Sequence, residues 1–213
     1  MTPEEASTQA RDVCNLAPVI PVLTVPDAAK AEGLARALVA GGLPALEVTL
    51  RTPAALDAIR EMTKVDGGVV GAGTIMSPDD VVAAKDAGAL FGVSPGSTPA
   101  ILDKAEEVGL PMLPGAVTAT EIMALLARGY TMLKFFPAEA SGGASALGAF
   151  SGPIPQATFC PTGGVSLTNV RTYLRLPNTL CVGGSWVAPA DMIASEDWHG
   201  IETLARDAAA LKP

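Results

Sequence analysis

Short apolar segments alternate with amphipathic segments along almost the whole chain. Each apolar segment is six or seven residues long, which is typical of a strand buried on both faces. The segments lie at 19–25, 45–50, 69–74, 89–94, 111–116, 131–136, 157–162 and 179–184. Strands that alternate with helices predict a parallel sheet.

The amphipathic segments carry signals for helix boundaries. SPDD (77–80) combines a capping residue, a proline in the first turn and acids at the positive end of the helix dipole. Gly88 and Gly129 follow two such segments, where glycine commonly ends a helix. The predicted helices cover 28–42, 54–62, 78–88, 98–109, 118–129, 167–175 and 197–211, and another at about 4–14 precedes the first strand.

Eight strand–helix units predict a (β/α)8 TIM barrel with an extra N-terminal helix, built as one domain from residues 1–213. An open, doubly wound sheet is the alternative arrangement of the same units. In a barrel of this kind, chemistry gathers at the C-terminal ends of the strands, so candidate residues are sought there.

Charge and composition restrict the possible partners. The net charge is -8 and no cluster of lysine and arginine occurs, so nucleic acid is not an expected partner. We expect a cytoplasmic protein, because the N-terminus lacks an apolar signal segment and no apolar run is long enough to cross a membrane.

Metal and cofactor chemistry is not expected from the residue inventory. Cys14, Cys160 and Cys181 are sparse and lack CxxC spacing, which favours buried free thiols over a disulfide framework or a zinc site. His199 is the only histidine, so a histidine base or a set of histidine ligands is not expected either.

The segment GYTMLKFFPAE (129–139) places Lys134 in the middle of an apolar strand. Burial disfavours the charged ammonium and favours the neutral amine, which attacks ketones to form a Schiff base. A buried ion pair with Glu47 is the structural alternative, and both interpretations can hold together. The other lysines fall in helical or terminal segments: Lys30, Lys64, Lys85, Lys104 and Lys212.

A second predicted strand ends in LEVTLR (46–51), where Glu47, Thr49 and Arg51 point to one side. A carboxylate within a parallel strand needs a partner, and near a Schiff base it could transfer protons directly or through water. The planar guanidinium of Arg51 matches a substrate carboxylate, although a surface position at the start of a loop would also explain it.

Two glycine pairs follow neighbouring strands, in PTGG (161–164) and VGGS (182–185). Barrels often hold a phosphate there, because glycine lets backbone N–H groups approach an anion. Thr162 and Ser185 add hydroxyl groups. Together with an amine and an arginine, these features predict Schiff-base aldol cleavage of a phosphorylated keto acid, without a metal.

Several motifs of the chain resemble the class I 2-keto-3-deoxy-6-phosphogluconate (KDPG) and 4-hydroxy-2-oxoglutarate (KHG) aldolases, in the same order and over nearly the whole length. They are LEVTLR (46–51), GAGT (71–74), SPG (94–96), PGAVT (114–118), KFFPAE (134–139), FCPTGGV (159–165), NVR (169–171) and CVGGSW (181–186). The resemblance implies a homotrimeric TIM barrel without a cofactor. It also implies cleavage of KDPG to pyruvate and glyceraldehyde 3-phosphate, in the Entner–Doudoroff pathway, and in many members cleavage of KHG to pyruvate and glyoxylate.

The resemblance further implies a role for each matching residue. Lys134 would form the Schiff base and Glu47 would act as general acid and base through water. The pyruvate pocket would comprise Arg51, Thr74, Pro95 and Phe136. The phosphate-bearing half of the substrate would contact Thr162, Gly163, Gly164 and Ser185.

Two departures from the family pattern concern the substrate and not the Schiff base. Ala116 and Val117 make the PGAVT loop less polar than the common PGIST. The segment 141–146 lacks a lysine often found near this point, and Ala146 could not help to bind phosphate. Two alternatives concern the substrate: an aldolase for the galactonate stereoisomer and a KHG specialist. A non-catalytic binder of sugar phosphates and a metal-dependent pyruvate aldolase are further alternatives, and Lys134, Glu47 and Arg51 argue against the binder.

Overall fold

Parallel strands form two sheets in the computed structural model, which describes residues 1–211. The strand order is β5-β4-β3-β2-β1-β9 in one sheet and β6-β7-β8 in the other. The strands are β1 Val19–Leu23, β2 Ala45–Thr49, β3 Val69–Gly73, β4 Phe91–Val93, β5 Met112–Leu113, β6 Gly115–Ala116, β7 Met132–Phe135, β8 Thr158–Pro161 and β9 Val182–Gly184. The parallel α/β prediction is confirmed.

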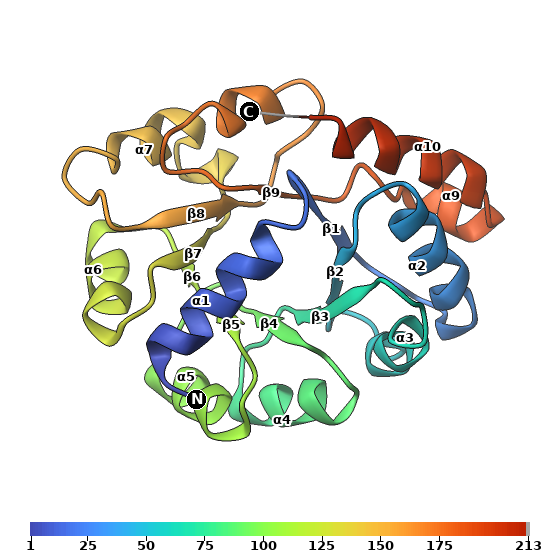
Figure 1. Ribbon diagram of the computed structural model, residues 1–213, viewed down its shortest axis with the longest axis horizontal. Helices are drawn as coiled ribbons and strands as arrows, with labels where there is room; N and C mark the ends of the chain where they lie inside the picture. The colour runs from blue at the N-terminus through green and yellow to red at the C-terminus, as the bar shows by residue number, and fades with distance from the viewer. Residues whose placement is uncertain (212–213) are drawn as a thin grey trace.

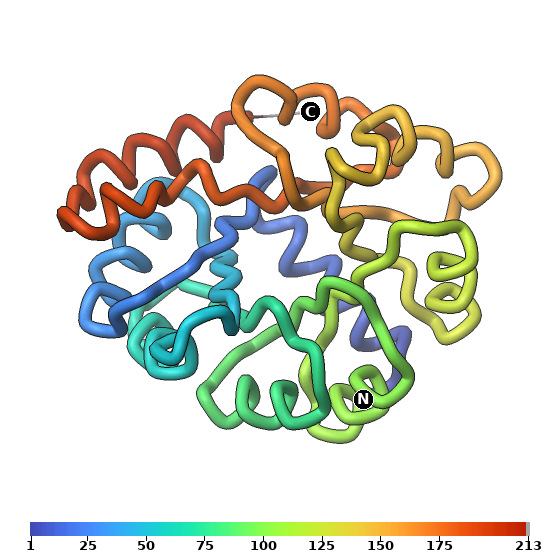
Figure 2. Tube along the Cα trace, turned by 180° about the vertical axis from the view of Figure 1, so that it is seen from behind, coloured from blue at the N-terminus to red at the C-terminus, as the bar shows by residue number. Residues whose placement is uncertain are grey.

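The strands curl around a common centre, and most helices lie outside them (Figure 1). The helix α1 instead crosses one end of the strands and contacts β5 and β7. Figure 2 shows the opposite side, where the loops that follow the strands lie. The helices are α1 Pro3–Cys14, α2 Ala31–Ala40, α3 Ala55–Met62, α4 Pro78–Asp86, α5 Pro99–Val108, α6 Ala119–Arg128, α7 Gly143–Ala149, α8 Val170–Leu174, α9 Ala190–Ser195 and α10 Trp198–Ala209, with 3-10 turns η1 Ala28–Lys30 and η2 Glu139–Ser141.

Pro114 divides the segment predicted as one strand at 111–116 into β5 and β6. Proline has no N–H to donate to a neighbouring strand, so the regular ladder is interrupted at this residue. The Pro114 carbonyl still accepts a hydrogen bond of 2.9 Å from the backbone N–H of Lys134. On the other side, a parallel bridge between Thr162 and Gly183 links the end of β8 to β9.

Successive side chains of each strand point to opposite faces, so the buried apolar residues form two separate clusters. One packs between the strands and the outer helices, and the other fills the space inside the strands with residues such as Phe91 and Met132. Cys14, Cys160 and Cys181 belong to this inner cluster as buried free thiols, as the sequence predicts. Met132 faces inward, so Lys134, two residues further along β7, faces inward as well.

Most predicted helices are present with small shifts at their ends, and two helices were missed. The prediction overlooked α7 and α9, because the Gly- and Ala-rich segment of α7 and the six residues of α9 carry weak periodicity. The caps behave as expected: Ser77 Oγ accepts a 3.1 Å hydrogen bond from the N–H of Asp80 at the start of α4. No helix within residues 1–211 is both long enough and apolar enough to cross a membrane.

Candidate active site

Lys134 of β7 and Glu47 of β2 meet in the space enclosed by the strands. Their Nζ and Oε1 atoms are 3.1 Å apart, and the two residues are only 4% and 3% exposed. The Lys134 Nζ also lies 5.2 Å from the centre of the Phe136 ring. Removing two charges from water is costly unless they remain paired, so each group needs the other. An amine this close to a carboxylate can exchange a proton with it.

The other lysines have different surroundings. Lys64 and Lys104 form ion pairs of 2.6 Å with Glu61 and Glu107 on the outside of the molecule, where such pairs contribute little. Lys30 and Lys85 donate to backbone carbonyl groups at 2.5 and 2.7 Å. Lys212 lies outside the described residues. Within residues 1–211, Lys134 is the one lysine that belongs to a strand.

A cavity of about 210 Å³ opens where β1, β8 and β9 end, next to the loop that follows β2. Six of the residues expected from the sequence line it: Arg51, Phe136, Thr162, Gly163, Gly164 and Ser185. The structure therefore brings a guanidinium, an aromatic ring, two hydroxyl groups and a glycine turn to one place. This combination can hold an organic anion beside the lysine–glutamate pair.

Arg51 is held at this cavity by Thr74, which follows β3. The Nε atom of Arg51 donates a hydrogen bond of 3.2 Å to Thr74 Oγ1. Within the described residues Arg51 forms no ion pair, so its guanidinium is available to a ligand carboxylate. Thr74 has a φ of 63°, which is unusual for a β-branched residue. Strain of this kind is concentrated at functional sites.

The turn after β8 requires glycine at two positions. Gly163 and Gly164 have φ values of 96° and 79°, in the left-handed region that other residues avoid. Gly183 in β9 is required for a different reason, because a Cβ atom there would lie 2.2 Å from Thr162 Oγ1. The glycine pairs thus allow a close approach of backbone at the cavity, as well as the turn itself.

Lys134, Glu47 and Thr74 are not among the residues that line this cavity, and neither is Pro95. Its carbonyl oxygen packs against Gly115, where a Cβ atom would lie 2.2 Å away. Sequence reasoning missed three residues that do line the cavity, Val22, Thr24 and Val165, whereas Gly183 belongs to the glycine pair predicted at 182–185. No local signal marked Thr24, which lies two residues after Val22 on the same face of the first strand and its extension. Its Oγ1 lies 3.3 Å from Thr49 Oγ1.

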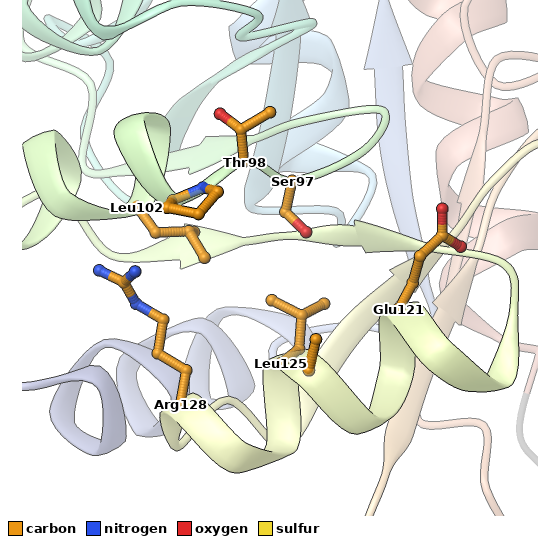
Figure 3. Close-up of a pocket in the computed structure, with 8 residues that line it drawn as sticks. Ser97, Thr98, Leu102, Glu121, Leu125 and Arg128 are labelled. Carbon is orange, nitrogen blue, oxygen red and sulfur yellow. The ribbon is translucent and has the colours of Figure 1, made fainter.

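A separate groove of about 160 Å³ lies between α5 and α6 (Figure 3). Leu102 and Leu125 face each other across it, with Arg128 at one end and Glu121 at the other. Both charged groups are already engaged: Arg128 pairs with Asp103 and Glu106, and Glu121 caps the start of α6. Backbone and hydroxyl hydrogen bonds from Val117 and Thr118 lower the pKa of Glu121. The groove therefore presents no free reactive group among the residues that line it.

A parallel α/β fold and a buried lysine–glutamate pair next to a cavity are the features that a lysine-dependent (class I) aldolase requires. A model of the KDPG and KHG aldolase family matches residues 10–204, and the chain belongs to this family. The prediction made from the sequence motifs is thereby confirmed.

Individual relatives cover nearly the whole chain. The 2-dehydro-3-deoxy-phosphogluconate aldolase of Pseudoalteromonas atlantica is 48% identical over 202 residues, which are 94% of each chain. The KHG/KDPG aldolase of Escherichia coli K12 is 47% identical over 94% of this chain and 95% of its own. A crystal structure of the KDPG aldolase of Legionella pneumophila, with pyruvate captured as a covalent carbinolamine, has a TM-score of 0.91 and 41% identity, over 94% of this chain and 98% of that one.

Proposed function

We propose that this protein cleaves 2-dehydro-3-deoxy-6-phosphogluconate to pyruvate and glyceraldehyde 3-phosphate through a Schiff base on Lys134. The observation that carries the proposal is the buried 3.1 Å contact between Lys134 and Glu47 beside the cavity. The P. atlantica relative is named for this substrate, and the L. pneumophila relative binds pyruvate covalently. Cleavage of 4-hydroxy-2-oxoglutarate to pyruvate and glyoxylate is a second activity, since the E. coli relative is named for both.

The proposed reaction begins with transfer of a proton from the Lys134 ammonium to the Glu47 carboxylate. The freed amine adds to the substrate ketone, and Glu47 then returns its proton to the carbinolamine hydroxyl, which leaves as water. A protonated imine and the Glu47 carboxylate result. Glu47, acting through water, then removes the proton of the C4 hydroxyl, and the electrons of the C3–C4 bond move to the imine nitrogen. The aldehyde leaves, C3 of the enamine takes a proton, and hydrolysis releases pyruvate and Lys134.

The cavity divides naturally into two halves for this substrate. Arg51 binds the carboxylate of the pyruvyl half, with Thr74 holding the guanidinium and Phe136 packing beside Lys134. Pro95 contributes indirectly: its carbonyl group packs against Gly115 in β6, and Gly115 pairs in register with Lys134. The phosphate-bearing half is held by the backbone N–H groups of Gly163 and Gly164 and by the hydroxyls of Thr162 and Ser185.

Changing Thr74 to glycine separates stability from substrate binding. Relief of the strained φ of 63° is expected to raise the free energy of unfolding by about 1 kcal/mol. The greater flexibility of glycine in the unfolded chain opposes this gain, so the net free energy of unfolding should not fall. The same change removes the hydroxyl that holds Arg51, so KM for the keto acid should rise. Thr74→Ser keeps the hydroxyl and should keep the KM. Denaturant unfolding and steady-state kinetics measure both effects, and a Thr74→Gly variant with unchanged KM would contradict the assignment.

We also propose that residues 1–213 form one domain with a closed (β/α)8 barrel and α1 across its N-terminal end. Two observations support closure. Only Pro114 separates β5 in one sheet from β6 in the other, and the bridge between Thr162 and Gly183 joins β8 to β9. Each half of the proposed active site then lies at the C-terminal ends of neighbouring strands.

Membership of the KDPG and KHG aldolase family suggests an oligomeric state and a cellular location for this protein. We propose a homotrimer, which size-exclusion chromatography with light scattering would show as three times the chain mass. A cytoplasmic location fits a phosphorylated sugar acid, because such an anion does not cross a bilayer unaided.

The first test is to trap the imine. Incubation with pyruvate and sodium borohydride, followed by intact and peptide mass spectrometry, is expected to show a reduced pyruvyl adduct on Lys134. The absence of an adduct, or an adduct on a surface lysine such as Lys104, would remove the Schiff-base mechanism.

The second test identifies the aldehyde half. Values of kcat/KM for the gluconate and galactonate stereoisomers and for 4-hydroxy-2-oxoglutarate are expected to be highest for the phosphorylated gluconate derivative. A higher value for either other substrate would assign the protein to that activity. Rates should not change in EDTA, and loss of activity there would indicate a metal-dependent reaction.

A further inference from the structure

The glycine turn at the cavity is fastened from behind by the segment that follows the lysine strand. The backbone N–H of Ala138 donates to the carbonyl of Thr162 at 2.8 Å, and that of Glu139 donates to the carbonyl of Gly163 at 3.1 Å. Both bonds start only four or five residues after Lys134. The segment that directly continues the lysine strand is therefore hydrogen-bonded to the turn.

The side chain of Glu139 supports the turn a second time. It packs directly against Gly164, where a Cβ atom would lie 2.6 Å from Glu139 Cγ. Its Oε1 accepts a hydrogen bond from the hydroxyl of Tyr173 in α8. Tyr173 has no exposed surface, so the acidic side chain is anchored to a fixed point in the core.

The anchor remains a hydrogen-bond donor over the whole working range of pH. Burial raises the pKa of Tyr173, and the hydrogen bond to Glu139 and the charge of its carboxylate raise it further. A third contact restrains the far end of the turn, where Asn169 Nδ2 donates to the carbonyl of Gly164 at 3.0 Å. The turn is thus held by groups that do not line the cavity themselves.

We infer that Glu139, anchored by Tyr173, is a positioning residue that aims the N–H groups of Gly163 and Gly164 at the phosphate-bearing half of the substrate. The inference rests on the proposed function and deepens it. Neither side chain is among the residues that line the cavity, so both act through the backbone of the turn. The pyruvyl half, bound by Lys134 and Arg51, does not depend on this support.

The test uses Tyr173→Phe with Tyr130→Phe as the matched control. Tyr130 is also fully buried, and its hydroxyl also donates to a glutamate, at 3.0 Å to Glu106. Tyr130 and Glu106 do not line the cavity. In Tyr173→Phe, KM for the phosphorylated substrate is expected to rise on the order of tenfold, because small errors in position weaken binding strongly. Borohydride trapping of pyruvate and exchange of its methyl hydrogens should stay within about twofold of the original rates.

Variants of Glu139 make the test specific. Glu139→Ala should raise the same KM as Tyr173→Phe, and the double variant should add nothing, because the two side chains act as one unit. Glu139→Gln keeps both the packing against Gly164 and a hydrogen-bond acceptor for Tyr173, so it should restore most of the affinity.

The outcomes are distinguishable from a failure of the proposed function. If the unchanged protein forms no adduct with pyruvate, the Schiff-base proposal fails. The positioning role is wrong if the adduct forms and folded Tyr173→Phe has the same KM for the phosphorylated substrate as the Tyr130→Phe control. It is also wrong if the rate of pyruvate exchange in Tyr173→Phe falls by the same factor as KM rises. Circular dichroism and thermal unfolding confirm that each variant compared is folded.

Discussion

Replacing Lys134 by alanine is expected to abolish aldol cleavage and the borohydride-trapped adduct, while the chain still folds. Alanine removes the nucleophilic amine and with it the electron sink on which breaking the C3–C4 bond depends. No residue that lines the cavity carries an amine that could replace it, since these residues are apolar, hydroxyl-bearing, glycine or Arg51. The assays are steady-state cleavage, peptide mass spectrometry and circular dichroism. Retained turnover would disprove the mechanism.

The same substitution is expected to lower stability, because it leaves the carboxylate of Glu47 buried without its partner. Breaking a buried ion pair from one side costs about 3–5 kcal/mol. Removing both charges, as in Lys134→Met with Glu47→Gln, should recover much of this loss without recovering activity. Such a result would show that the pair contributes to stability and that the amine is needed for chemistry, so both interpretations made from the sequence would hold.

Lys104→Ala is the matched control for these measurements. Lys104 also pairs with a glutamate, Glu107 at 2.6 Å, but the pair lies on the outside of α5. Its loss should change stability by less than about 1 kcal/mol and should leave turnover intact.

Replacing Glu47 by glutamine is expected to lower kcat by about 10²–10⁴-fold, the usual contribution of a positioned acid or base. Glutamine keeps the size of the side chain and a hydrogen bond to Lys134, but it cannot carry a proton between steps. The pyruvyl adduct on Lys134 should form more slowly in the presence of borohydride, because Glu47 also accepts the proton of the Lys134 ammonium. Exchange of the methyl hydrogens of pyruvate with deuterium, followed by NMR, should be slowed as strongly as cleavage.

Glu106→Gln provides the comparison, since Glu106 is a half-buried carboxylate paired with Arg128 at 2.9 Å. It lies outside the cavity lining and its variant should exchange and cleave normally. Rapid exchange in Glu47→Gln would assign the proton transfer to another group. An adduct that forms at the original rate would show that Glu47 does not take the proton of the Lys134 ammonium.

The fold could largely be predicted because each strand and helix carries its own local signal. Runs buried on both faces, together with caps such as Ser77 and glycines such as Gly129, mark the boundaries within a few residues. The prediction was wrong where the local signal was weak or mixed. The helix α7 is rich in glycine and alanine, and Pro114 interrupts a strand whose apolar pattern continues through it.

The candidate site was predictable in part for a related reason. A lysine within an apolar strand, and glycine pairs at strand ends, are anomalies that local structure does not explain. Thr24 and Val22 carried no such anomaly, because a threonine and a valine are ordinary in a strand. Glu139 lies in the KFFPAE motif and Tyr173 in a predicted helix, and nothing in the sequence pairs them.

The sequence by itself determined the order of strands and helices, the family, and the identity of Lys134 as an exceptional residue. These properties depend on residue type and on spacing within one segment. Only the tertiary structure decided that Lys134 contacts Glu47, that Arg51 is held by Thr74, and that Tyr173 anchors Glu139 beneath the glycine turn. Such contacts join residues separated by 23 to 87 positions, and the packing of distant strands, not local preference, brings them together.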